Sequence, residues 1–428
     1  MAHHFERRNG DMFVEDVPLS TIAAEVGTPV YVYSTATLER HFTVFSSAFQ
    51  SLDALVCFAV KANSNVAVLK VLADLGAGAD VVSGGELKRA LAAGIPGERI
   101  VFSGVGKTPD EMKLALEAGI HQFNVESEPE LEALSKVASA MGVEAPIAFR
   151  VNPDVDAKTH AKISTGKAEN KFGIAWSRAR PAYAHAASLP GIAVKGVDVH
   201  IGSQLTELGP FREAFEKVAG LVADLRADGH EIVQLDLGGG LGIPYAAGSN
   251  TAPPLPADYG ALIADVAGGL GCQIILEPGR LIAGNAGVLL TKVLYVKEGE
   301  ERRFVIVDAA MNDLIRPAMY DAHHDIVPVV EPSSQDQWTA DIAGPVCETG
   351  DVFAKSRAIS PVAAGELMAI MSAGAYGAVL SSTYNTRPLV PEVLVKGDAW
   401  AVIRRRPSVD ALLALDSLPP WSSQWAAE

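Results

Sequence analysis

The chain has 428 residues, of which 49% are hydrophobic and 20% charged, a composition typical of a folded protein of about two domains. Its formal net charge of −16 at pH 7 disfavours binding to nucleic acid or to an anionic membrane. No apolar stretch reaches the ~18 residues of a membrane span, and the polar residues 1–11 are not typical of a signal peptide. Three scattered cysteines exclude a disulfide framework and a cysteine zinc site, which favours a reducing cytoplasm.

Residues 28–284 alternate short apolar runs with helical patterns. The eight runs are almost continuously apolar, as expected of parallel strands that are buried on both faces. They cover residues 55–60, 79–82, 100–102, 121–125, 147–151, 194–201, 231–237 and 272–277. Helical periodicity covers residues 35–49, 65–75, 85–93, 110–118, 129–141, 211–228 and 258–269. Ser64 and the segment Thr108 to Asp110 provide capping chemistry before two of these helices.

Eight strands that alternate with helices over roughly 250 residues predict an α/β fold, a (β/α)8 TIM-like barrel. The alternative is a doubly wound open sheet. After residue 284 strand-like runs follow one another with few helical patterns between them, which predicts a mostly antiparallel β domain. Residues 1–27 are too short to fold alone, so we expect them to join residues 285–428 in that domain. The barrel, residues 28–284, would then be inserted in the β domain.

Reactive residues of a barrel lie where its strands end, and the sequence has candidates at those points. Lys61 follows the first strand run, where burial would lower its pKa and allow its amine to react with a carbonyl cofactor. The alternative is a lysine that reaches solvent from a strand end. His200 ends the sixth run and could stack on an aromatic cofactor or move a proton, or simply be a hydrogen-bonded rim residue. Ser203, three residues later, could donate to a phosphate.

A glycine run, Gly238 to Gly242, follows the seventh strand run, at the place where barrels often bind phosphate through backbone N–H groups. The run lacks the Lys-Ser/Thr of a P-loop, and a tight turn is the alternative. Glu277 ends the eighth run and could keep a pyridine nitrogen protonated, or pair with Arg280. Arg280 could instead bind a substrate carboxylate through two parallel hydrogen bonds.

The β domain offers weaker candidates. Cys347 stands beside Glu348 in a Gly-containing turn, so the pair could be a proton donor and a substrate-binding carboxylate, or an inert turn. Arg316, Tyr320 and Tyr376 are plausible contacts for an anion.

Together these segments resemble the fold-type III decarboxylases that depend on pyridoxal 5'-phosphate (PLP). The likeness preserves the order of four motifs, and it spans about residues 28–400. The motifs are Phe58–Asn63, His200–Gln204, Gly238–Gly242 and Glu277–Arg280. In this family the first motif carries the PLP lysine, the second the ring-stacking histidine, the third the phosphate loop and the fourth the partner of the pyridine nitrogen.

The resemblance implies a role for each candidate. Lys61 would hold PLP as a Schiff base, with His200 on the ring and Glu277 at its nitrogen. The other residues near PLP, most of them around its phosphate, would be Ser203, Gly239, Gly240, Gly279, Arg280 and Tyr376. The substrate would be bound by Arg280, Arg316, Tyr320, Glu348 and Tyr376. Cys347 would protonate the substrate carbon.

Two further features of the family would apply here. Cys347 and Glu348 would reach the active site from the other subunit, which implies a homodimer, and the segment His160–Gly173, with Lys167 and Lys171, would form a mobile lid. Within the family, the β-domain motifs are most similar to those of the diaminopimelate decarboxylases. The alternatives are an ornithine, arginine or carboxynorspermidine decarboxylase, an alanine-racemase-like enzyme and a non-catalytic relative that binds a partner protein.

Overall fold

The computed structural model describes residues 3–156, 171–246, 252–300, 302–332 and 336–421. The chain forms two compact units. The first contains Met1–His4, Ser34–Gly287 and Gly374–Val379, and the second contains Phe5–Tyr33, Val288–Ala373 and Leu380–Glu428. We keep residues 28–284 as the proposed extent of a cofactor-binding domain.

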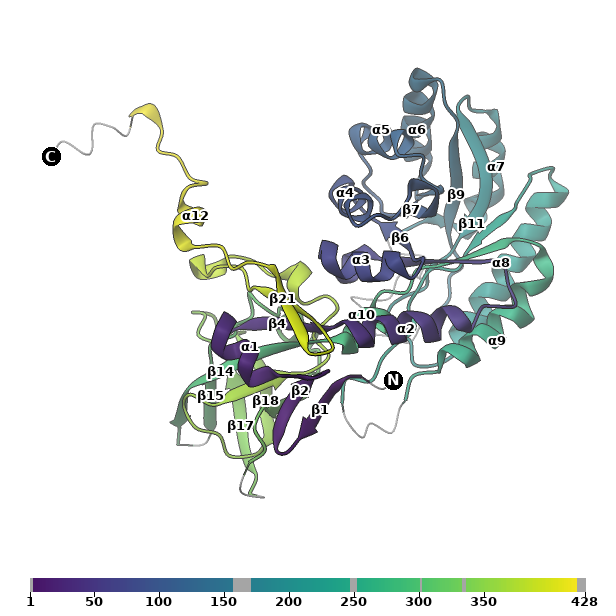
Figure 1. The fold of residues 1–428 in the computed structure, drawn as a ribbon. Coiled ribbons are helices and arrows are strands. Elements are labelled where there is room, and N and C mark those ends of the chain that lie inside the picture. The colour runs from purple at the N-terminus through teal and green to yellow at the C-terminus, as the bar shows by residue number, and fades with distance from the viewer. Residues whose placement is uncertain (1–2, 157–170, 247–251, 301, 333–335, 422–428) are drawn as a thin grey trace. The chain divides into compact units, whose positions relative to one another are not determined.

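The first unit is a closed parallel barrel of eight strands (Figure 1). The strands are β5 (Ala54–Ala59), β6 (Gly78–Val81), β7 (Ile100–Phe102), β8 (Gln122–Val125), β9 (Ala145–Asn152), β11 (Ile192–Asp198), β12 (Gln234–Asp236) and β13 (Gln273–Leu276). Each pairs in parallel with the next, β13 pairs with β5, and the pairing of β8 with β9 completes the ring. The barrel prediction is therefore confirmed and the open sheet is excluded.

Helices cover the outside of the barrel (Figure 1). They are α2 (Thr35–Ser47), α3 (Val66–Asp74), α4 (Gly84–Ala92), α5 (Pro109–Glu117), α6 (Glu128–Met141), α7 (Ala179–Ser188), α8 (Gly209–Ala227) and α9 (Pro256–Ala267). A short buried helix, α10 (Arg280–Ala283), follows β13. Thr108 forms the expected capping box with Glu111 at the start of α5. The cap of α3 was predicted wrongly, because Asn65, and not Ser64, accepts the N–H of Ala67. Helix α7 and the short strand β10 (Ile174–Ala175) were not predicted.

The barrel interior has two chemically different levels. Leu55, Cys57, Val101 and Ile275 form a small buried apolar cluster, as in an ordinary barrel core. The other level is polar, with buried side chains from five strands: Asp80, Gln122, Asn124, Arg150, Asp198 and Asp236. Side chains two apart in a strand share a face, so Gln122 and Asn124 enter the interior together. Burying so many polar groups is costly unless they bond to one another, and such a group is typical of a functional site.

The second unit is a β domain. Its strands are β1 (Phe5–Arg8), β2 (Asp11–Val14), β3 (Val17–Pro18), β4 (Val30–Ser34), β14 (Gly287–Glu298), β15 (Arg303–Val307), β16 (Ile326–Pro328), β17 (Trp338–Ala343), β18 (Val352–Ile359), β19 (Leu367–Ile370), β20 (Glu392–Lys396) and β21 (Ala399–Arg404). Its helices are α1 (Leu19–Val26), α11 (Arg316–Tyr320) and α12 (Val409–Leu413). The main sheet has the order β18-β17-β15-β14-β4-β20-β21.

The β domain is mostly antiparallel, as predicted, although β15 and β17 pair in parallel. Its apolar core uses alternate residues of the strands, such as Val30 with Val32 and Val393 with Val395. None of the helices in the described ranges is both long enough and apolar enough to span a membrane.

Candidate active site

Lys61 lies just beyond the carboxyl end of the first barrel strand. Strand β5 ends at Ala59, and a 3-10 turn, Val60–Ala62, carries the lysine past the strand end. Its Nζ lies 2.6 Å from Oδ2 of Asp80, a carboxylate on β6 whose side chain has no exposed area. Burial lowers the pKa of Lys61, but the charges of Asp80 and Glu277 outweigh burial and raise it. The lysine is therefore an ammonium in this state, and it must lose a proton before its nitrogen can form a bond.

Glu277 follows β13 directly and enters the same polar interior. Its Oε1 accepts hydrogen bonds from Ser103 Oγ at 3.2 Å and from Asn124 Nδ2 at 3.3 Å. Burial raises the pKa of Glu277, and the charges of Asp236 and Asp80 raise it further. A carboxyl group held in this way is well suited to share a proton with a basic nitrogen, because a nearby positive charge would favour its ionised form.

Asp236, on β12, is joined to the same group. Its Oδ2 accepts a bond of 2.9 Å from Asn124 Nδ2, and its Oδ1 accepts the backbone N–H of Gly238 at 3.0 Å. Burial and the charge of Asp198 raise the pKa of Asp236 to about 8, against the effect of these two donors. Asn124 therefore links the carboxyl groups of Asp236 and Glu277, and Asp236 in turn accepts the N–H of Gly238 at the start of the glycine run.

The glycine run leaves no room for side chains at its centre. A Cβ on Gly239 would lie 2.2 Å from the carbonyl oxygen of Glu277, and one on Gly240 would lie 2.4 Å from that of Gly202. Gly240 also has a φ of 111°, which side chains rarely allow. The N–H of Gly239 donates to Nδ1 of His200 at 3.2 Å. The N–H of Gly239 therefore joins the run to the histidine, although β11 ends at Asp198, three residues before the end of the predicted strand, 194–201.

His200 is neutral in this setting. Burial lowers the pKa of His200 well below its usual value, and the charges of Arg150 and Lys61 lower it further. Because Nδ1 accepts the N–H of Gly239, the single proton of the neutral ring is on Nε2.

Arg280 stands among hydroxyl and aromatic groups in the first unit. Its guanidinium donates to Ser203 Oγ at 3.1 Å and to the hydroxyl of Tyr245. It also lies 4.7 Å from the centre of the Tyr376 ring. The N–H of Tyr376 bonds to the carbonyl oxygen of Ala62 at 2.8 Å, so this segment adjoins the turn that carries the lysine.

Gly279 allows two strand ends to approach each other. A Cβ there would lie 2.9 Å from that of Ala62 and 3.0 Å from that of Ala59. The barrel unit thus brings together the nine residues predicted near the cofactor. They are Lys61, His200, Ser203, Gly239, Gly240, Glu277, Gly279, Arg280 and Tyr376. Sequence reasoning missed Asp80, Asn124, Asp236 and Tyr245.

The remaining candidates belong to the second unit. Arg316 and Tyr320 begin and end α11, and Arg316 is buried. Cys347 is an exposed free thiol on a loop, and its N–H donates to Oδ1 of Asn385 at 3.0 Å. Glu348 follows on the same loop, where its N–H bonds to the carbonyl oxygen of Val346. Participation of these four residues in the active site stays a prediction.

The predicted lid, His160–Gly173, falls mostly outside the described residues, including Lys167. Lys171 is described, and at the end of the segment Gly173 donates its N–H to Glu126 at 3.0 Å.

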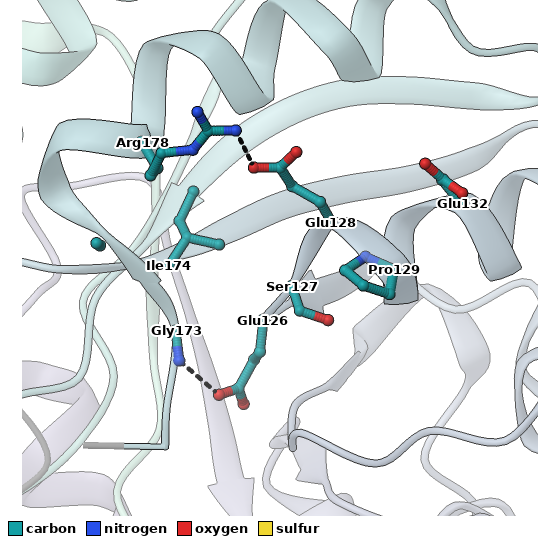
Figure 2. A pocket seen from close by; sticks show the side chains of 9 residues that line it. Glu126, Ser127, Glu128, Pro129, Glu132, Gly173, Ile174 and Arg178 are labelled. Carbon is teal, nitrogen blue, oxygen red and sulfur yellow. Dashed lines mark hydrogen bonds and ion pairs between the residues drawn. The ribbon is translucent and has the colours of Figure 1, made fainter. Parts of the chain in front are cut away.

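A cavity of about 530 Å3 lies where β8 leads into α6 (Figure 2). It is lined by Glu126–Glu128, Pro129, Glu132, Gly173–Ala175 and Arg178. It contains none of the predicted cofactor residues, and its carboxylates are engaged: Glu126 pairs with Arg150 at 3.2 Å and Glu128 with Arg178 at 2.7 Å. Among the described residues, no group of His, Cys, Asp or Glu side chains is placed to hold a metal ion.

Comparison with known proteins gives consistent matches. Residues 35–284 match the family described as "Pyridoxal-dependent decarboxylase, pyridoxal binding domain". The chain is 53% identical to the diaminopimelate decarboxylase of Zymomonas mobilis, over 97% of this chain and 99% of that protein.

Two solved structures are also similar. One is diaminopimelate decarboxylase from Helicobacter pylori complexed with L-lysine, with 41% identity, a TM-score of 0.89 and coverage of 93% of this chain and 98% of that one. The other is diaminopimelate decarboxylase from M. jannaschii with L-lysine, with 38% identity, a TM-score of 0.92 and coverage of 97% and 98%.

Proposed function

Because the chain belongs to the pyridoxal-dependent decarboxylases, in the branch of the diaminopimelate decarboxylases, we propose that it uses PLP to convert meso-2,6-diaminopimelate into L-lysine and CO2. One observation supports this most strongly. A lysine amine, a buried glutamate and a glycine run with no room for side chains all lie at the carboxyl ends of strands in one barrel.

The residues at the barrel mouth suit PLP chemically. The glycine run lets an anionic group approach the backbone N–H groups, and Ser203 and Arg280 provide donors and a positive charge nearby. Glu277 is a carboxyl group in low-dielectric surroundings, which can hold a proton on a pyridine nitrogen. The amine of Lys61 is anchored by Asp80 within the same group.

When bound, PLP supplies an electron sink for the charge left on the substrate carbon as CO2 departs. The protein orients and protects the reacting groups. Lys61 would carry the cofactor through Nζ, and Glu277 would keep the ring nitrogen protonated. His200 would lie on the ring without adding charge, because its imidazole is neutral. Gly239, Gly240, Ser203 and Tyr376 would bind the phosphate.

Substrate contacts would come from Arg280 of the first unit and from residues of the second unit. Arg280, Arg316 and Tyr320 would bind the distal carboxylate of the substrate, and Glu348 would bind its distal ammonium. Cys347 would deliver a proton to the substrate carbon from Sγ. We propose a homodimer in which Cys347 and Glu348 of one protomer complete the site of the other. The exposure of the Cys347 loop in the single chain is consistent with such an arrangement.

A CO2-release assay tests the proposal. Purified protein is supplied with meso-diaminopimelate, with and without PLP, and L-ornithine and L-arginine serve as competing substrates. We expect PLP-dependent release of CO2 that is fastest by orders of magnitude with meso-diaminopimelate, and none from the Lys61→Ala variant. Faster turnover of L-ornithine or L-arginine, or undiminished activity without Lys61, would contradict it.

A further inference from the structure

In the β domain, both ring nitrogens of the His324 imidazole form hydrogen bonds. The residue is fully buried, four positions after the end of α11. Its Nε2 lies 2.8 Å from a guanidinium nitrogen of Arg316, and its Nδ1 lies 2.8 Å from the carbonyl oxygen of Met371. The sequence motifs described above assign His324 no role in binding or catalysis.

The chemistry of the two neighbours fixes the protonation of the ring. A guanidinium only donates hydrogen bonds, so Nε2 of His324 must accept from Arg316. A carbonyl oxygen only accepts, so Nδ1 must carry the proton that is donated to Met371. The ring is therefore neutral, with one defined tautomer, and its plane is fixed by two bonds that point in different directions.

We infer that His324 is a positioning residue for substrate recognition: its neutral Nε2 orients the guanidinium of Arg316 toward the distal carboxylate of the substrate. The inference rests on the proposed function, in which Arg316 binds that carboxylate. A guanidinium binds a carboxylate best through two parallel hydrogen bonds, which requires a defined plane. His324 supplies that constraint.

A neutral acceptor suits this role better than an acidic one. An aspartate or glutamate at the same place would orient Arg316 but would also neutralise its charge, which would weaken its attraction for an anionic substrate. An imidazole acceptor adds no negative charge. Charged groups nearby include Arg357, which donates to the backbone oxygen of His324 at 3.0 Å, and His323, which pairs with Asp325 at 2.8 Å.

Two substitutions separate the functions of the two ring nitrogens. In His324→Asn the short amide can replace Nδ1 at Met371 but does not reach Arg316. In His324→Gln the longer side chain can place an amide oxygen near the position of Nε2. His323→Asn is the matched control, because it changes the adjacent, partly exposed histidine, which bonds to Asp325 and Arg357.

The measurement is steady-state turnover of meso-diaminopimelate by the PLP-loaded variants. A charge-assisted hydrogen bond contributes about 1.5–3 kcal/mol, so we expect His324→Asn to raise KM about 10- to 100-fold. We expect kcat to change less than KM, because the reacting atoms are untouched. His324→Gln should restore KM to within a few-fold of the unsubstituted chain, and His323→Asn should leave it unchanged.

A double-substitution cycle shows whether the effect passes through Arg316. If it does, adding His324→Asn to Arg316→Gln should raise KM no further. Full additivity in this cycle, or an unchanged KM in His324→Asn, would overturn the inference while leaving the proposed function intact. Absence of turnover in the unsubstituted chain would instead reject the proposed function. If His324→Asn does not fold, His324→Gln decides alone, and a KM raised tenfold or more would overturn the inference.

Discussion

The amide of Asn124 should be the most consequential neutral group in the barrel interior. Its Nδ2 lies within bonding distance of Asp236 (2.9 Å), Ser103 (3.1 Å) and Glu277 (3.3 Å). Its Oδ1 accepts a bond of 2.6 Å from Gln122. The change Asn124→Leu keeps the approximate volume but removes all four contacts, and it leaves two buried carboxyl groups without this donor.

The structure sets the size of the effect. A buried group that loses its partner costs about 1–3 kcal/mol, and more when it is charged. Two hydrogens of Nδ2 are shared among three acceptors, and Gln122 also loses its acceptor, so we expect a total loss of about 3–5 kcal/mol in the free energy of unfolding. Protonation of Asp236 can relieve part of this loss at low pH. The loss should therefore be larger at pH 8 than at pH 6.

Urea unfolding of cofactor-free protein at both pH values, together with a fluorescence titration with PLP, measures these effects. Thr108→Ala is the control, because it removes a helix cap, at a cost of about 1 kcal/mol, and affects no buried carboxyl group of the barrel interior. We expect only Asn124→Leu to weaken PLP binding, because the carboxyl of Glu277 loses its orientation. Equal, pH-independent losses in both variants with unchanged PLP affinity would show that Asn124 does not hold the buried carboxyl groups in this way.

Three further outcomes are expected. Cys347→Ala should slow turnover while PLP still binds, and unchanged rates would show that the proton donor is another group. Gly239→Ala should lower stability by about 1–3 kcal/mol and abolish PLP binding, because its Cβ would lie 2.2 Å from a carbonyl oxygen. The matched change Gly220→Ala, in α8 with nothing within 4 Å, should be neutral or stabilising by up to about 1 kcal/mol, and both can be compared by urea unfolding. The folded-state pKa of Asp236, raised to about 8, lies above that of the unfolded carboxyl, so the unfolded chain binds fewer protons between pH 4 and 8. Stability of the cofactor-free protein should therefore fall as pH rises through this range, by at most roughly 5 kcal/mol from this group, and Asp236→Asn should flatten the profile.

Much of the barrel could be predicted from the sequence because its strands are short, apolar and regularly spaced. Lys61, Glu277 and the glycine run were recognisable since each directly follows such a strand. Helix α7 was missed because it is rich in alanine, with little contrast between its faces, and has Pro181 in its first turn. Its burial comes from packing in the barrel unit, which a local pattern does not report.

The polar interior was harder to predict. Asp80, Asn124 and Asp236 lie within strands. The sequence pattern of such a strand reveals neither whether a polar side chain faces the barrel interior nor which residues it would contact there. Their bonds join residues as far apart in sequence as Asn124 and Glu277. Tyr245 had a weak signal, its position three residues after the glycine run. The bond between His324 and Arg316 depends on the path of the chain after α11, which the sequence pattern does not define.

Reduction of the purified protein with borohydride, followed by peptide mass spectrometry, identifies the side chain that carries PLP. We expect a phosphopyridoxyl mass on the peptide that contains Lys61, located at that side chain by fragmentation. A protein that carries this mass on a different lysine, or on none after incubation with PLP, would contradict this expectation.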